Sequence, residues 1–85
     1  MKQVIKFYAD WCGPCKVYAP IFDKVVEDLN VEHKSVNIDK DTTGLAAKYL
    51  IRSIPATVLV ENDKVLNKAV GLLNEGTLIK FINHA

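Results

Sequence analysis

Cysteine is scarce in this chain, and its scarcity restricts what the two cysteines can do. Cys12 and Cys15 are the only two among 85 residues, so none is left to build the disulfide framework that small secreted domains use. Such sparing use of cysteine is typical of proteins from a reducing compartment. We therefore expect a cytoplasmic protein.

Long apolar runs and a bias in charge are also missing. No stretch approaches the roughly 20 apolar residues that a transmembrane helix needs, and the first residues contain no apolar core of a signal peptide. The 11 basic and 10 acidic residues are interspersed and give a formal net charge of +1. We therefore expect neither a nucleic-acid partner nor a membrane surface.

The chain does contain a pair of cysteines two residues apart, in the stretch Trp11-Cys12-Gly13-Pro14-Cys15. The pair lies where an apolar run gives way to a helical pattern. A helix N-terminus favours a thiolate, the form that attacks, because its N–H groups are unpaired and carry partial positive charge. Cys12 is then the nucleophile, and Cys15, one turn further on, can resolve a mixed disulfide formed on Cys12. The spacing predicts thiol–disulfide exchange.

Two other uses of the pair stay open. A structural disulfide would close so short a loop that it would contribute only about 2 kcal/mol. A zinc site needs four ligands, and the chain offers the cysteine pair with His33 and His84, which lack the short spacing of a zinc finger. Lys16 follows Cys15 where a haem attachment motif would require histidine.

Apolar periodicity predicts alternating strands and helices in one domain over residues 1–85. Strands are predicted at residues 3–8, 33–38, 56–61 and 64–70. Helices are predicted at residues 13–30, from a cap at Thr42 or Thr43 to residue 49, and at residues 77–83 after a cap at Asn74. Strand, helix and strand in succession indicate a right-handed parallel unit, and Asn62-Asp63 indicates a hairpin. The order is β-α-β-α-β-β-α, an α/β fold.

With this order, four segments of the chain resemble the thioredoxin family. They are residues 7–16 with Ala19-Pro20, residues 36–39, residues 49–55 and residues 70–71. The segments follow one another in the family's order and span nearly the whole chain. A lone C-x-x-C pair would be weak evidence, whereas W-C-G-P-C followed by Ile54-Pro55 at this separation is specific.

The resemblance implies roles that the spacing alone does not give. Ile54-Pro55 would be a cis peptide packed against the cysteines, and the backbone of Ile54 would pair with an extended substrate segment. The substrate-binding surface implied in this way comprises Trp11, Gly13, Pro14, Ile54, Pro55, Gly71 and Leu72. For Trp11 the alternative is a place in the core, which is common for a large aromatic side chain.

The chain departs from the family in length. Thioredoxins usually have a further strand and helix before the active-site strand, and only Met1 and Lys2 precede it here. We therefore expect a minimal thioredoxin-like fold with three helices and a four-stranded mixed sheet. Residues 34–37 would form an edge, which Lys34 protects against pairing with other chains.

A second departure concerns charge. The family has a buried aspartate at the position of Lys6 and a lysine at the position of Ser35, and neither is kept. Our hypothesis is that Lys6 modulates Cys15, either as an ammonium that stabilises the thiolate or as a neutral amine that accepts its proton. The alternative is that its stem packs on the sheet while its amine reaches water.

The function implied by the resemblance is that of a protein disulfide reductase, an electron carrier in cell redox homeostasis. It would need no metal or cofactor beyond the redox-active disulfide Cys12–Cys15. The expected partners are protein disulfides and either thioredoxin reductase or a glutathione-type reductant, and the expected state is a monomer. Alternatives are a glutaredoxin-like reductase, in which an aromatic residue is more usual than Pro14, and a non-catalytic binding module.

Overall fold

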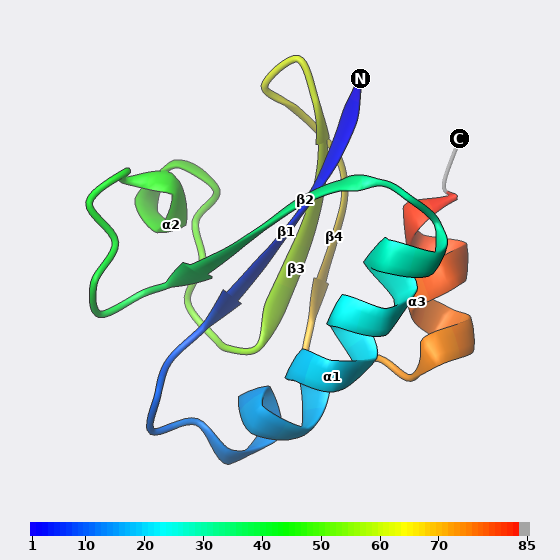
Figure 1. Cartoon of the computed structure of the whole chain (residues 1–85). Coiled ribbons are helices and arrows are strands. Elements are labelled where there is room, and N and C mark those ends of the chain that lie inside the picture. Colours follow the sequence, from blue (N-terminus) through cyan, green and yellow to red (C-terminus); the bar gives the residue numbers. More distant parts are fainter. Residues whose placement is uncertain (84–85) are drawn as a thin grey trace.

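A four-stranded sheet lies at the centre of the computed structural model, which describes residues 1–83 (Figure 1). In chain order the elements are β1 (Lys2–Tyr8), α1 (Gly13–Asp28), β2 (Glu32–Asn37), α2 (Leu45–Lys48), β3 (Ala56–Glu61), β4 (Lys64–Val70) and α3 (Glu75–Ile82). The predicted order is confirmed, and β3 and β4 have the predicted bounds. The other elements begin or end a few residues from where the sequence predicts.

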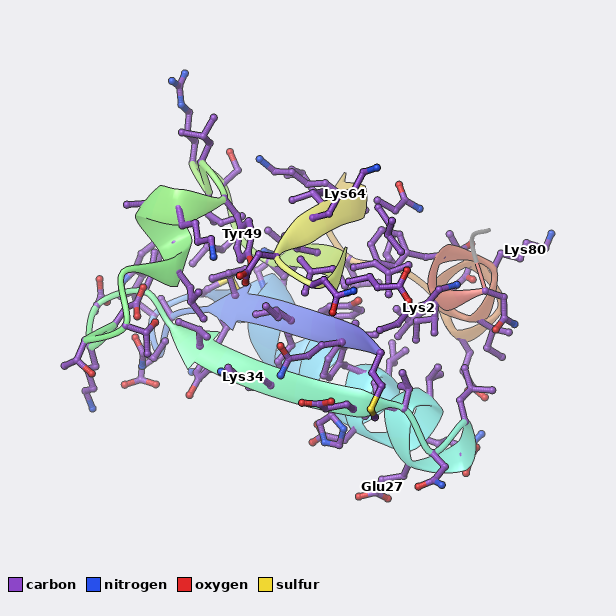
Figure 2. The ribbon with its side chains drawn as sticks, turned by 90° about the horizontal axis from the view of Figure 1, so that it is seen from above. Lys2, Glu27, Lys34, Tyr49, Lys64 and Lys80 are labelled. Atoms are coloured by element: carbon purple, nitrogen blue, oxygen red, sulfur yellow. A yellow bond between two sulfur atoms is a disulfide. The ribbon has the colours of Figure 1, made fainter. Side chains whose placement is uncertain are left out.

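The sheet has the strand order β2-β1-β3-β4. Strand β1 is parallel to β2 and antiparallel to β3, and β3 is antiparallel to β4. The mixed four-stranded sheet is therefore confirmed, with β2 as one edge, where Lys34 is exposed (Figure 2). Asn62 and Asp63 have φ angles of 51° and 67°, as the two-residue turn of a hairpin requires.

Helices cover both faces of the sheet (Figure 1). Helices α1 and α3 pack together on one face, and α2 lies on the other. The first face buries Val4, Tyr18, Phe22, Val25, Val26, Leu59, Leu78, Phe81 and Ile82. The second buries Ile5, Phe7, Val36, Tyr49, Ala56, Val58 and Val60. Neighbouring residues of β1 point to opposite faces, so this one strand contributes to both cores. None of the helices within residues 1–83 has the length and apolarity needed to cross a membrane.

The start of α2 differs from the prediction. The residue before the helix is Gly44, with φ of 74°, but the Thr43 hydroxyl accepts a hydrogen bond from the backbone N–H of Leu45, the first helical residue, at 3.2 Å. The carboxylate of Asp41 also contributes to the cap, because it accepts hydrogen bonds from the backbone N–H of Ala46 (3.0 Å) and of Thr43 (2.9 Å). The Thr43 hydroxyl also bonds to Asp41, and these bonds lower the pKa of Asp41. The expected threonine therefore bonds one N–H at the start of α2, and the Asp41 carboxylate bonds the next.

A buried hydroxyl pair joins α1 to the sheet. The Tyr18 hydroxyl lies 2.7 Å from Oγ1 of Thr57 on β3, and neither residue is exposed. Burial raises the pKa of Tyr18 to about 12, although the bond to Thr57 acts in the opposite direction. The pair fixes the height of α1 over β3 and thereby the position of the helix N-terminus.

We predict that Tyr18→Phe lowers the free energy of unfolding by about 1–2 kcal/mol, because it leaves the buried Thr57 hydroxyl without a partner. Urea denaturation measures the change. The double variant Tyr18→Phe/Thr57→Val should recover part of the loss, since it removes both polar groups. A double variant that is less stable by the sum of the two single changes would contradict this coupling.

Candidate active site at the N-terminus of helix α1

The candidate site lies at one end of the sheet, where β1, β2 and β4 end and β3 begins. In the strand register, Phe7 of β1 pairs with Ala56 at the start of β3, and Ala56 pairs with Val70 at the end of β4. Tyr8 pairs with Asn37, so β1 and β2 end together there. The chain leaves β1 here and enters α1, which brings the helix N-terminus to the same place.

The two cysteines occupy the first turn of α1 and are joined by a disulfide, with their Cα atoms 5.3 Å apart. Cys12 is the N-cap residue, and its Sγ accepts a hydrogen bond from the backbone N–H of Cys15 at 3.2 Å. Residue exposure is 5% for Cys12 and 3% for Cys15. The N–H that contacts Cys12 Sγ is one of the unpaired donors of the helix end, so it would also stabilise a thiolate at that position.

A zinc site finds no support. No group of three or more potential metal ligands of the His, Cys, Asp or Glu type comes together in the part of the chain that the structure describes. His33 is exposed, with its ring against the edge of Phe22 and its Nδ1 3.1 Å from the Val31 carbonyl oxygen. His84 lies outside the described residues.

The Ile54–Pro55 segment forms the opposite wall of the site. Its peptide bond is cis, as the resemblance implies, and the Ile54 side chain packs against the cluster of Ala9, Cys12 and Cys15. The Pro55 carbonyl accepts a hydrogen bond from the N–H of Gly71 at 2.7 Å. Within residues 1–83 the backbone of Ile54 makes no hydrogen bond, so its N–H and C=O are available to another chain.

Trp11 is on the surface, and the alternative of a core position is wrong. It is 69% exposed, and its indole N–H donates a 2.7 Å hydrogen bond to the Asp39 carboxylate. The Asp39 N–H in turn donates to the Asn37 side chain at 3.0 Å, and the Asn37 amide donates to Asp10 at 3.3 Å. The loop after β2 therefore fixes the indole ring beside the cysteines.

Other residues of the predicted binding surface lie at the same end of the sheet. Gly13 and Pro14 are exposed, and Leu72 is 43% exposed. Gly71 has φ of 98°, a conformation that suits glycine, and this lets the chain turn away after β4. The predicted surface residues are therefore close in space although they come from three separate segments.

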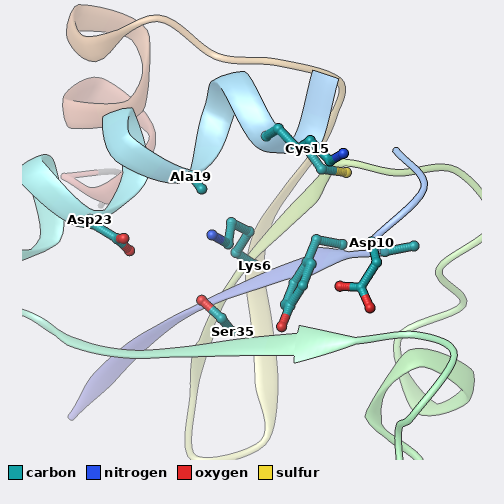
Figure 3. Close-up of a pocket in the computed structure, with 9 residues that line it drawn as sticks. Lys6, Asp10, Cys15, Ala19, Asp23 and Ser35 are labelled. Carbon is teal, nitrogen blue, oxygen red and sulfur yellow. The ribbon is translucent and has the colours of Figure 1, made fainter. Parts of the chain in front are cut away.

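Lys6 lies below the cysteines, in a cavity of about 520 Å³ that Cys15, Asp23 and Ser35 also line. The lysine residue is 5% exposed, and its Nζ lies 5.1 Å from the centre of the Phe22 ring. Figure 3 shows the amine pointing toward Asp23 and away from the Cys15 sulfur. Burial lowers the pKa of Lys6, whereas the charge of Asp23 raises it.

Two residues of this region were not identified from the sequence. Asp23 follows Cys15 and Ala19 at intervals of four, so the three share one face of α1 and line the cavity with Lys6. That spacing is visible in the sequence and could have identified Asp23. Asp39 is harder to find, because its link to Trp11 depends on β1 and β2 ending side by side.

Comparison with known proteins gives a consistent result. The family model described as Thioredoxin matches residues 1–84. A thioredoxin of Buchnera aphidicola is 39% identical over 84 residues, which covers 94% of this chain and 74% of the relative. One from Mycoplasmoides gallisepticum is 37% identical over 78 residues, covering 91% and 77%. The X-ray structure of Fasciola hepatica thioredoxin superposes with a TM-score of 0.88 at 31% identity, covering 99% and 81%.

We predict that Asp39→Ala frees the Trp11 ring. Trp11 is the only tryptophan, so the acrylamide quenching constant of the intrinsic fluorescence measures its accessibility without interference. This constant should rise in Asp39→Ala and stay near the wild-type value in Asp39→Asn, which retains a hydrogen-bond acceptor. Equal quenching of all three proteins would show that Asp39 does not hold the ring.

Proposed function

This chain belongs to the thioredoxin family and is a thiol–disulfide oxidoreductase, and from that premise we propose that Cys12 is its attacking sulfur and Cys15 its resolving sulfur. The observation that carries the assignment is the N-cap position of Cys12, whose Sγ accepts the N–H of Cys15. Charge on Cys12 is favoured by this donor and by the helix dipole. Cys15 lies inside the first turn and is the less exposed of the two.

The reaction proceeds in two exchanges. The Cys12 thiolate attacks one sulfur of a substrate disulfide, a Cys12–substrate disulfide forms, and the other substrate sulfur leaves as a thiolate that takes up a proton. Cys15 loses its proton and attacks Cys12 Sγ, which forms the Cys12–Cys15 disulfide and releases the second substrate thiol. Two electrons have passed to the substrate. A reductase returns them, and no metal or cofactor other than the redox-active disulfide is needed.

Substrate binding involves the surface around the cysteines. Ile54 supports this proposal most directly, because its free backbone N–H and C=O can pair with an extended substrate segment. The rest of the proposed site consists of Trp11, Gly13, Pro14, Gly71 and Leu72, together with Pro55, whose side chain is buried. Exposed Trp11 and Leu72 offer apolar contacts to a substrate.

The protein that carries out this exchange is proposed to be a monomeric cytoplasmic domain of residues 1–85. The sparing use of cysteine supports a reducing compartment. Its reductant is proposed to be a thioredoxin reductase rather than glutathione, since Pro14 stands where glutaredoxins tend to carry an aromatic residue. Recycling of the oxidised protein by thioredoxin reductase with NADPH, compared with glutathione and its reductase, tests that choice.

Lys6 is proposed to modulate Cys15 as an ammonium group across the shared cavity. Its position at a wall of the cavity that Cys15 also lines supports an electrostatic effect on the thiolate. A stabilised thiolate favours the dithiol form and makes the protein a stronger oxidant. Asp23 limits this effect, because the amine points toward its carboxylate (Figure 3).

We predict that Cys12→Ser and Cys15→Ser each abolish reduction of insulin disulfides by dithiothreitol above the uncatalysed rate, because each removes one of the two exchanges. When the reduced variants are mixed with insulin after dithiothreitol has been removed, Cys15→Ser should accumulate a covalent disulfide with an insulin chain, detected by mass spectrometry, whereas Cys12→Ser should not. His33→Gln, a change at an exposed residue, is the control. Wild-type activity in either serine variant would refute the mechanism.

We predict that Lys6→Met lowers the redox potential by on the order of 10 to 30 mV, where about 30 mV corresponds to 1.4 kcal/mol. Lys6→Asp should lower it further, because it places a negative charge beside Cys15. Lys80→Met, a change at an exposed residue of α3 that also removes one positive charge, is the control. Equal potentials for wild type and both Lys6 variants would remove Lys6 from the mechanism.

A further inference from the structure

A second hollow lies beside the Ile54–Pro55 segment, on the side away from the Lys6 cavity. It has a volume of about 220 Å³ and is lined by the loop of residues 50–53, by Ala56, and by Lys68 and Val70 of β4. Ser53 and Ala56 directly flank the cis peptide. A substrate segment that pairs with the Ile54 backbone would reach this hollow within a few residues, since each extended residue spans about 3.3 Å.

The ionisable residues of the hollow are both cations. Lys68 Nζ donates hydrogen bonds to the carbonyl oxygens of Tyr49 (2.8 Å) and Leu50 (3.1 Å), which fix its position but do not neutralise its charge. Arg52 is exposed, and among residues 1–83 no carboxylate lies within ion-pair distance of it. Two positive charges therefore face the same hollow without a negative partner.

Two exposed apolar side chains complete the hollow. Leu50 is 68% exposed and Val70 is 60% exposed. Leu50 is held in a left-handed conformation with φ of 56°, and its N–H donates to the Ala47 carbonyl, so its side chain is presented by a fixed backbone. A hollow lined by exposed apolar side chains and two cations fits an extended peptide in which an acidic side chain lies next to an apolar one.

We propose that this hollow is a specificity subsite for substrate proteins that carry aspartate or glutamate within a few residues of the attacked cysteine. The proposal rests on the proposed function, because the substrate segment must first pair with Ile54. Arg52 is the specificity-determining residue, and Lys68 adds a fixed charge behind it. A nucleic acid is a poorer fit, since the two cations are isolated in a chain whose formal net charge is only +1.

The test uses a set of matched peptide disulfides. Each peptide carries one test residue, which is aspartate, asparagine or lysine, at a single position between three residues before and three residues after the attacked cysteine. The value of kcat/KM is measured for each peptide. At one or two adjacent positions, aspartate should exceed asparagine by about two- to fivefold, and lysine should be the poorest. The preference should shrink as the salt concentration is raised, because the charges are exposed to solvent.

Arg52→Gln should abolish this preference, so that the ratio of kcat/KM for the aspartate peptide to that for the matched asparagine peptide falls to about one. Lys64→Gln removes a positive charge from the far end of β4, outside the hollow, and should keep the preference. Equal rates for the aspartate and asparagine peptides at every position, or a preference that survives Arg52→Gln, would overturn the subsite while the proposed function stands. No reduction of any peptide by the wild type would instead overturn the proposed function, and the subsite with it.

Discussion

The double pairing of β1 is the constraint on which the rest of this structure depends. Strand β1 is parallel to β2 on one side and antiparallel to β3 on the other. The ends of β1 and β2 and the start of β3 therefore lie together at the same end of the sheet. Helix α1 begins at that end of the sheet because it follows β1 and connects it to β2. Cys12 at the helix N-terminus and the cis Ile54–Pro55 segment thus come together, although about half of the chain lies between them.

This arrangement separates the environments of the two sulfurs. Cys12 stands at the end of the helix, in contact with a backbone donor and close to exposed Trp11. Cys15 faces inward to a cavity whose charged residues are Lys6, Lys16, Asp10 and Asp23. The helix end favours negative charge on the outer sulfur, and the charges of the cavity act on the inner one. Because the two environments are built from different residues, substitution below Cys15 can tune the potential without altering the surface that meets the substrate.

Much of this could be predicted from the sequence, for a physical reason. Strands β3 and β4 were predicted residue for residue because the β-branched run of β3 leads into the clear turn signal Asn62-Asp63, and Gly71 marks the end of β4. Cys12, Cys15 and Ile54-Pro55 belong to local motifs that are readable without a structure. At the start of α2 the predicted Thr43 hydroxyl does bond a helix N–H, whereas the second bond, from the Asp41 carboxylate, was not predicted because Asp41 lies outside the helix. Contacts set by strand register, such as that of Trp11 with Asp39, leave no periodic signal in the sequence.

The central claim is that position in the first turn of α1 gives the two cysteines different reactivity, and one measurement tests it directly. The fully reduced wild-type protein is treated with a limiting amount of iodoacetamide between pH 5 and pH 9, and peptide mass spectrometry reports which sulfur has reacted. Cys12 should be alkylated first, and it should keep this advantage down to the lowest pH at which alkylation is detected. Alkylation of Cys15 first, or of both cysteines at the same rate throughout, would contradict the account.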